Sequence, residues 1–202
     1  MTEKILAREQ LVAAIAAERA AGRTVAVANG CFDLLHVGHI RYLRAASREA
    51  DCLLVAINDD AVAAMKGPGR PILPAGARAE LVAAIRGVKY VTVFSDPTVA
   101  PLLSLLRPDV HCKGTDYTVE TVPERETVLA YGGRIAIVGD PKQHSTRDLL
   151  ARLRRLDSSS CGSARSVTSC TRCLRQPRFA PLILTRSSIG SWMRATAASL
   201  IW

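Results

Sequence analysis

The fold is decided by the stretch Thr24-Val-Ala-Val-Ala28-Asn29-Gly-Cys-Phe-Asp33-Leu-Leu-His36-Val-Gly-His39, which passes from apolar to polar residues. Residues 24–28 are apolar or β-branched, a pattern that predicts a buried strand. Residues 40–46 follow with apolar side chains at helical spacing, which predicts a helix. The stretch therefore predicts a strand, a turn and a helix whose start carries two histidines.

The turn before this helix has the properties of an anion-binding site. A helix N-terminus offers unpaired backbone N–H groups and the positive end of the helix dipole. Gly38 lets a ligand approach the backbone, and Gly30 can make the tight turn after the strand. Imidazole donates hydrogen bonds to phosphate, with charge assistance when it is protonated. The pattern favours a phosphate-binding role for His36 and His39; the alternative is two surface or capping histidines that share this spacing by chance.

The rest of the sequence alternates strand and helix patterns. Apolar runs predict four more strands, at residues 51–57, 90–94, 109–112 and 134–138. Helical spacing predicts further helices at residues 5–21, 77–85, 98–106, 120–131 and 148–156. This alternation predicts an α/β fold with a doubly wound parallel sheet and right-handed crossovers. In such a sheet, ligands bind at the carboxyl ends of the strands.

Further segments place charged or polar residues near those strand ends. The loop Lys66-Gly-Pro-Gly-Arg70-Pro71 has two glycines and two prolines, so it cannot hold a helix or a strand. Its two cations can reach a phosphorylated ligand; the alternative is a solvated surface loop. Arg78 lies in the first turn of a predicted helix, where a cation opposes the dipole, so its position indicates a ligand-facing role. Two more motifs carry such residues. Lys113-Gly-Thr-Asp116-Tyr117 begins just after a predicted strand, and Ser145 or Thr146 could cap the last predicted helix and present hydroxyl and backbone N–H groups to phosphate.

The composition argues against membrane and nucleic-acid roles. The chain has 202 residues, enough for one domain with a core, and 49% of them are hydrophobic. It has no run of about 18 apolar residues, and its charged N-terminus lacks a signal-peptide core, so we expect a cytoplasmic protein. From Asp157 onward there are six arginines and one acidic residue, so more than half of the net charge of +9 lies there. The mildly basic remainder suits phosphorylated ligands and gives little indication of nucleic-acid binding.

Residues 157–202 differ in composition from the rest of the chain. Serine and arginine dominate, and no helical or strand periodicity is sustained. One interpretation is a flexible, disordered basic appendage that contacts a partner; the other is out-of-frame or non-homologous sequence after a complete domain. We prefer the second, because the change follows the last predicted helix directly, and we assign the domain to residues 1–156. Cys170-Thr-Arg-Cys173 has no second Cys/His pair, so no metal site is expected.

His36-Val-Gly-His39 resembles the HxGH signature of the nucleotidyltransferase superfamily, whose cytidylyltransferase-like members have a Rossmann-like fold. Over residues 3–156 the chain is most similar to the adenylyltransferase domain of ADP-heptose synthase, in the form that lacks a sugar kinase. The other motifs occur in the order of that family: the Lys66–Pro71 loop, Arg78-Ala-Glu, Lys113-Gly-Thr-Asp116-Tyr117 and Ser145-Thr146. The segment Lys142-Gln143-His144 departs from the family pattern, which commonly has Glu-Gly before Ser-Thr.

The resemblance implies transfer of AMP from ATP to D-glycero-β-D-manno-heptose 1-phosphate, with Mg²⁺ accompanying the ATP and no protein metal ligand. It implies a homodimer and catalytic roles for His36, His39 and Lys66. It implies nucleotide binding by Gly30, Cys31, Phe32, Gly38, Arg78, Lys113, Gly114, Asp116, Ser145 and Thr146, and substrate binding by Asp33, Arg70 and Tyr117. The near alternative is a cytidylyltransferase for glycerol 3-phosphate or a similar polyol phosphate, which shares the signature but not the Lys66–Pro71 loop. The distant alternative is a non-catalytic nucleotide-binding module.

Overall fold

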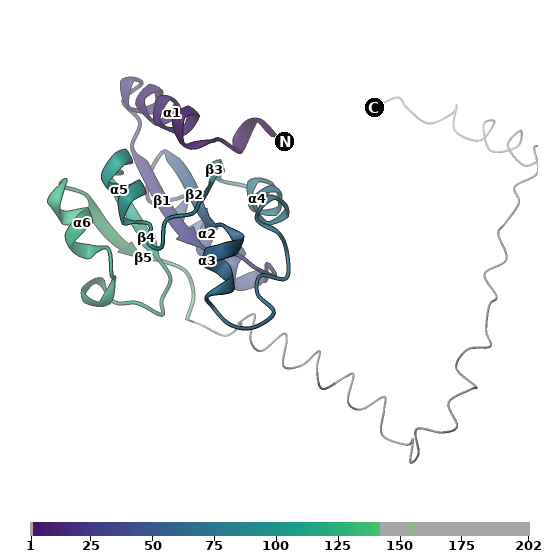
Figure 1. Cartoon of the computed structure of the whole chain (residues 1–202). Coiled ribbons are helices and arrows are strands. Elements are labelled where there is room, and N and C mark those ends of the chain that lie inside the picture. The colour runs from purple at the N-terminus through teal and green to yellow at the C-terminus, as the bar shows by residue number, and fades with distance from the viewer. Residues whose placement is uncertain (1, 142–154, 156–202) are drawn as a thin grey trace, which may run out of the picture. The chain divides into compact units, whose positions relative to one another are not determined.

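A computed structural model describes residues 2–141 and residue 155 of the chain. Its centre is a five-stranded parallel sheet in the order β3-β2-β1-β4-β5 (Figure 1). The strands are β1 (Val25–Gly30), β2 (Cys52–Asn58), β3 (Val88–Phe94), β4 (Val110–Lys113) and β5 (Arg134–Ile137). All five lie within two residues of the predicted runs, so the predicted doubly wound α/β sheet is confirmed.

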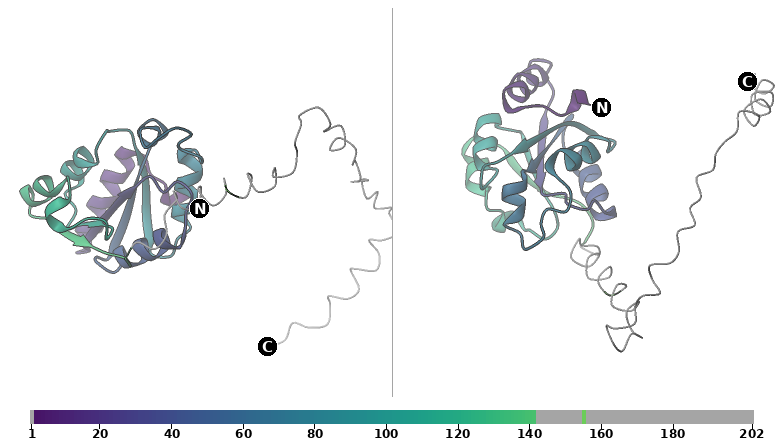
Figure 2. Two further views of the ribbon diagram at one scale, coloured as in Figure 1. Left: turned by 90° about the horizontal axis from the view of Figure 1, so that it is seen from below. Right: turned by 45° about the vertical axis from the view of Figure 1, so that its right-hand side comes forward.

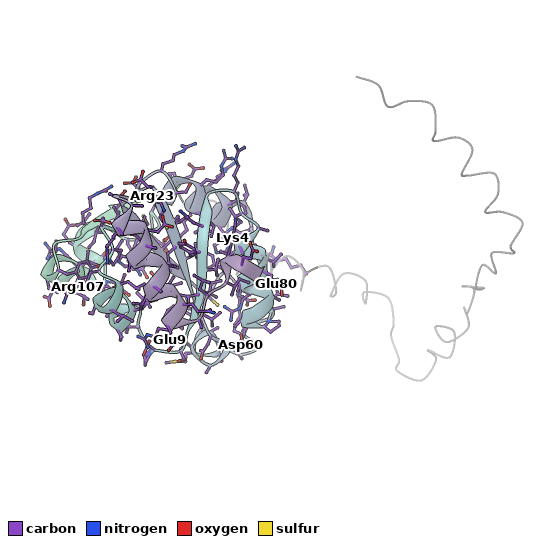
Figure 3. All side chains as sticks on the ribbon, turned by 90° about the horizontal axis from the view of Figure 1, so that it is seen from above. Lys4, Glu9, Arg23, Asp60, Glu80 and Arg107 are labelled. Atoms are coloured by element: carbon purple, nitrogen blue, oxygen red, sulfur yellow. The ribbon has the colours of Figure 1, made fainter. Side chains whose placement is uncertain are left out.

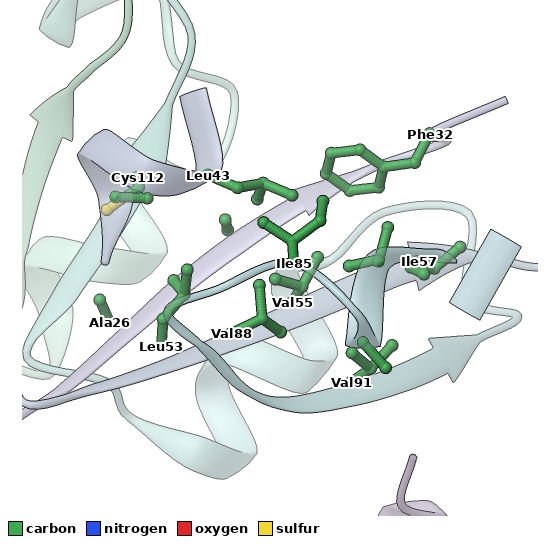
Figure 4. Close-up of a cluster of buried hydrophobic side chains, with 14 of the residues drawn as sticks. Ala26, Phe32, Leu43, Leu53, Val55, Ile57, Ile85, Val88, Val91 and Cys112 are labelled. Atoms are coloured by element: carbon green, nitrogen blue, oxygen red, sulfur yellow. The ribbon is translucent and has the colours of Figure 1, made fainter. Parts of the chain in front are cut away.

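Helices cover both faces of this sheet (Figures 1 and 2). Those with buried residues on one face are α2 (Val37–Ala46) and α4 (Ala75–Ala83), and those on the other are α1 (Arg8–Ala20), α5 (Ala100–Leu106) and α6 (Arg125–Ala130). Three short elements complete the described part: η1 (Thr2–Lys4), α3 (Asp60–Ala64) and η2 (Val119–Thr121). Figure 4 shows the core under α2 and α4, in which Phe32 reaches from the turn after β1 toward Ile57 and Ile85.

Two parts of the predicted secondary structure were wrong. The helix expected over residues 120–131 is divided into η2 and α6, because Pro123 has no N–H to donate and disfavours helical geometry in the residue before it. Val122 is accordingly extended, with φ −68° and ψ 119°. The short helix α3 was not predicted; it begins where the Asp59 carboxylate accepts a hydrogen bond from the Val62 backbone N–H at 2.8 Å.

Three predictions concern residues outside the described part of the chain. They are the helix over 148–156, the Ser145-Thr146 motif after Lys142-Gln143-His144, and the nature of residues 157–202. The domain boundary at residue 156 also stays a prediction. Among the described residues, no helix combines the length and the apolar character needed to cross a membrane.

The strand order reverses between β1 and β4, and the region outside the carboxyl ends of these two strands is called the crevice below. From β1 the chain proceeds outward to β2 and β3, and it then crosses through α5 to β4 on the other side of β1. The segment after β1 therefore runs to a helix on one face, and the segment after β4 runs to α6 on the opposite face. An open α/β sheet binds its ligands at such a reversal, outside the carboxyl ends of the strands.

A polar network around Glu18 lies at the other end of the sheet. Its buried carboxylate pairs with Arg23 and accepts hydrogen bonds at 2.8 Å from Lys89 Nζ and from the Tyr90 hydroxyl. The hydrogen bond from Arg23 contributes most to lowering the pKa of Glu18 to about 2. Figure 3 shows Arg23, before β1, and Asp60, after β2, at opposite ends of the view, so this network supports the fold and not the crevice.

We expect the Glu18 network to make stability depend on pH in the acid range. A carboxyl group whose pKa is about 2 in the folded chain and 4.5 otherwise stabilises the fold above pH 4.5. That contribution, about 1–2 kcal/mol because Arg23 and Lys89 are partly exposed, is lost as the pH falls from about 4.5 to 2. Urea unfolding at several pH values measures it. Glu18→Gln should remove this part of the pH dependence, and an unchanged profile would contradict the account.

Candidate active site

The turn between β1 and α2 has a strained backbone. Phe32 and Leu34 adopt left-handed conformations, with φ 52° and φ 56°. Such angles cost an ordinary residue roughly 1–2 kcal/mol and persist where the surroundings enforce them. The Phe32 side chain is buried, and a Cβ atom at Gly30 would lie 3.2 Å from its ring. The turn is therefore held in one shape, because the buried Phe32 ring packs against Gly30.

The two signature histidines lie together at the start of α2. His36 precedes the helix as its N-cap residue, and His39 belongs to the first turn. Their rings stack with centroids 3.9 Å apart and an interplanar angle of 27°. The His36 backbone N–H donates to His39 Nδ1 at 3.4 Å, so a neutral His39 carries its proton on Nε2. The pair thus places imidazole donors beside the positive end of a helix dipole, an arrangement that suits phosphate oxygens.

Asp33 joins the signature turn to the Lys66–Pro71 loop. The buried carboxylate accepts a hydrogen bond at 2.6 Å from Arg70 Nη1 and bonds at 3.0 Å from the backbone N–H groups of Ile72 and Leu73. Burial opposes ionisation, but these three donors outweigh it and lower the pKa of Asp33. Asp33 and Arg70, both predicted to bind substrate, therefore contact each other here. Their predicted contacts with substrate stay predictions, while Lys66 lies exposed on the loop that Asp33 fixes.

We expect Asp33→Asn to release this loop. The substitution keeps the size of the side chain but removes the charge that pairs with Arg70, so the free energy of unfolding should fall by about 1–3 kcal/mol. The released loop should also displace Lys66, and kcat/KM should then fall by a factor of about 10–100 in chains that are still folded. Asp96→Asn is the matched control, because Asp96 forms a surface ion pair with Arg8 at 3.5 Å. Equal effects of the two substitutions would contradict the role assigned to Asp33.

Arg78 lies beneath the turn with 0% of its surface exposed. Its guanidinium donates to three backbone carbonyls: Leu73 at 2.9 Å, Cys31 at 2.6 Å and Asn58 at 2.9 Å. It also donates to the Asp60 carboxylate at 2.7 Å. Arg78 therefore joins the signature turn, the end of β2, the start of α3 and the segment before α4. Its predicted contact with nucleotide stays a prediction, because the structure shows only these contacts with the protein.

The residues after β4 form a second charged group at the crevice. The buried Lys113 Nζ lies 3.0 Å from Glu124 Oε2 and 5.3 Å from the centroid of the Tyr117 ring. Burial, with the carboxylates of Asp116 and Glu124 nearby, raises the pKa of Tyr117. A Cβ atom at position 114 would lie 2.8 Å from Asp116 Oδ1, so the glycine lets this carboxylate lie against the backbone.

The predicted site residues in the described part of the chain therefore gather at the carboxyl ends of neighbouring strands. Gly30 ends β1, and Cys31, Phe32, Asp33, His36, Gly38 and His39 follow it. Lys113 ends β4, and Gly114, Asp116 and Tyr117 follow it. Ser145 and Thr146 lie outside the described residues. Sequence reasoning missed three residues that the structure adds to this edge: Asn29, His111 and Glu124. Glu124 was assigned to the helix predicted across Pro123, and His111 was assigned to an apolar strand, so neither was considered as a site residue.

Three of the described carboxylates at this edge are paired with cations. Asp33 pairs with Arg70, Asp60 with Arg78, and Glu124 with Lys113. The residues that the structure describes contain no group of three or more His, Cys, Asp or Glu side chains that could hold a metal ion. This donor set fits a divalent cation that arrives with a triphosphate and is held by phosphate oxygens and water.

Comparisons with known proteins agree with this arrangement. The family model described as cytidylyltransferase-like matches residues 27–160. The bifunctional protein HldE of Syntrophotalea carbinolica is 43% identical over 151 residues, which cover 74% of this chain and 31% of the relative. HldE of Alcanivorax borkumensis is 40% identical over 154 residues, or 76% of this chain and 32% of the relative. The chain thus spans about a third of the length of these curated relatives.

A solved structure shares the fold. The crystal structure of the lipopolysaccharide core biosynthesis protein from Thermoplasma volcanium aligns with a TM-score of 0.51 and 25% sequence identity. The alignment covers 59% of this chain and all of the other. The family model over residues 27–160 confirms the predicted family, and the chain belongs to the cytidylyltransferase-like family of nucleotidyltransferases.

Proposed function

We propose that this chain transfers AMP from ATP to a sugar 1-phosphate, D-glycero-β-D-manno-heptose 1-phosphate, and releases pyrophosphate. The observation that carries the proposal is the pair of stacked imidazoles at the start of α2, with centroids 3.9 Å apart beside the crevice. The choice of sugar is supported by the resemblance of residues 3–156 to the adenylyltransferase domain of ADP-heptose synthase, and by identity of about 40% to bifunctional HldE proteins.

The reaction is an in-line displacement at the α-phosphorus of ATP. An oxygen of the sugar 1-phosphate forms the new bond to that phosphorus, while the bond to the bridging oxygen breaks and pyrophosphate leaves with the electron pair. The attacking oxygen is already an anion, so no general base is needed, and catalysis consists of positioning and charge stabilisation. Mg²⁺ bound to the triphosphate would supply positive charge that contributes to this stabilisation.

Each group at the crevice has a place in this reaction. His36 and His39 would donate to the oxygens of the α-phosphate as negative charge develops there. Lys66, on the loop fixed by Asp33, would hold the two reacting phosphates together against their mutual repulsion. Lys113 and Tyr117 would contact the nucleotide or the sugar at the other side of the crevice. A homodimer, which the resemblance implies, belongs to the same proposal, and the molar mass in solution would test it.

The second candidate is a cytidylyltransferase acting on glycerol 3-phosphate or a similar polyol phosphate. The family model over residues 27–160 favours it, because its description names cytidylyl transfer. Both candidates share the signature turn and the displacement at the α-phosphorus. They differ in the base of the nucleotide and in the acceptor.

Pyrophosphate release separates the two candidates. The purified chain is supplied with Mg²⁺ and with ATP or CTP against heptose 1-phosphate or glycerol 3-phosphate. We expect release with ATP and heptose 1-phosphate alone. Release with CTP and glycerol 3-phosphate would move the chain to the second candidate, and no release from any pair would favour a binding module.

A further inference from the structure

A buried histidine lies where the strand order reverses, between β1 and β4. His111 lies in β4, where it is paired in register with Val27 of β1, and none of its surface is exposed. Its Nε2 atom lies 3.2 Å from Oδ1 of Asn29, at the carboxyl end of β1. Asn29 is partly exposed and immediately precedes the turn that leads to His36 and His39. The contact therefore joins β1 to β4 at the base of the crevice.

The chemistry of this contact fixes the state of both side chains. A carboxamide oxygen only accepts hydrogen bonds, so Nε2 of His111 must carry the proton. Burial, and secondarily the charge of Lys113, lowers the pKa of His111 to about 3, so the imidazole is neutral and keeps this tautomer. With Oδ1 held by His111, the two N–H donors of the Asn29 amide point away from it.

This arrangement does not serve stability. With the proton on Nε2, the His111 Nδ1 atom is an acceptor, and no described residue supplies it with a hydrogen bond. A buried acceptor without a partner destabilises the fold, and an apolar side chain in the same strand would avoid that cost. A polar residue kept at such a cost beside a ligand crevice indicates a functional demand.

We propose that His111 is a positioning residue that orients the Asn29 carboxamide, so that its N–H groups face the crevice and donate to an oxygen of the bound nucleotide or sugar phosphate. The inference rests on the proposed function for the identity of the ligand. It goes beyond that function by adding a pair of residues, Asn29 and His111, to the site. The effect of His111 passes through Asn29, and His111 does not touch the ligand.

Three substitutions test the pair. His111→Leu removes both the donor and the unsatisfied acceptor, so kcat/KM should fall about five- to tenfold while the unfolding midpoint stays equal or rises. His111→Gln supplies a donor in the place of Nε2 and should recover most of the activity. In chains that already carry Asn29→Ala, His111→Leu should have no further effect on kcat/KM. Additive losses, or an equal loss with Gln and Leu, would overturn the proposal. The substrate whose KM rises identifies the ligand that Asn29 contacts.

Two measurements separate this inference from the proposed function. Nitrogen-15 chemical shifts of the imidazole should show a neutral ring protonated on Nε2 that does not titrate from pH 5 to about 9. A ring protonated on Nδ1 would overturn the inference whatever the reaction. If the unmodified chain releases no pyrophosphate, the proposed reaction fails, and the inference is judged on ATP and CTP affinity, which His111→Leu should weaken about fivefold. Failure of the unmodified chain to bind either nucleotide would overturn both.

Discussion

Replacement of His39 by alanine is expected to lower kcat by about 100- to 1,000-fold, a loss of about 2.7–4 kcal/mol of transition-state stabilisation. The physical reason is that the proposed transition state gains negative charge on the α-phosphate oxygens. The His36 backbone N–H donates to Nδ1 of His39, so Nε2 is the ring nitrogen that carries the proton and can donate to these oxygens. The substrate carries less charge at these atoms, so KM should change much less than kcat. Steady-state pyrophosphate release measures both constants.

Two conservative substitutions sharpen this prediction. His39→Gln keeps a donor near the position of Nε2, whereas His39→Asn keeps only a group near Nδ1, so glutamine should retain more activity than asparagine. All three variants should unfold within about 1 kcal/mol of the unmodified chain, since the side chain lies at the helix start and not in the core. Unchanged turnover in His39→Ala would contradict the role of the pair.

Replacement of Arg78 by methionine is expected to lower the free energy of unfolding by about 3–5 kcal/mol. Methionine fills much of the volume but leaves the carbonyl oxygens of Leu73, Cys31 and Asn58 without the donors that they have now. A decrease of this size is a large part of the free energy of unfolding of an ordinary domain. Urea unfolding followed by circular dichroism measures it.

Two further substitutions serve as controls for Arg78→Met. Arg134→Met removes an exposed guanidinium that pairs with Glu49 at 2.9 Å, and it should cost less than about 1 kcal/mol. Arg78→Lys keeps the charge but cannot reach four acceptors in several directions, so it should be nearly as unstable as Arg78→Met. If Arg78→Met kept its stability and lost only nucleotide affinity, the guanidinium would be a ligand group, as its place in the sequence first indicated.

The sheet could be predicted from the sequence because its strands are continuous apolar runs between turn residues. The same patterns could not reveal α3, which has five residues and depends on a cap at Asp59. They also favoured one helix across Pro123, where the local propensity of the flanking residues was strong but the proline prevents continuation. Local periodicity therefore identified the long elements and failed at short or interrupted ones.

The signature histidines could be predicted because both lie in one local motif. The partners of the charged residues could not, since each pair joins residues far apart in the chain. Asp33 and Arg70, or Lys113 and Glu124, meet only when the sheet places their segments together. Reasoning from the sequence treated these groups as separate contacts for ligands. The structure shows that several of these charged groups contact one another, and that the Asn29 carboxamide contacts His111.

Transfer of label from ATP is the most direct test of the central claim. The chain is supplied with heptose 1-phosphate, Mg²⁺ and ATP labelled at either the α- or the γ-phosphorus, and the products are separated. We predict that the α-label appears in a nucleotide sugar and the γ-label in pyrophosphate, in equal amounts. Appearance of the γ-label on the sugar would show transfer of a single phosphoryl group, and it would contradict attack at the α-phosphorus.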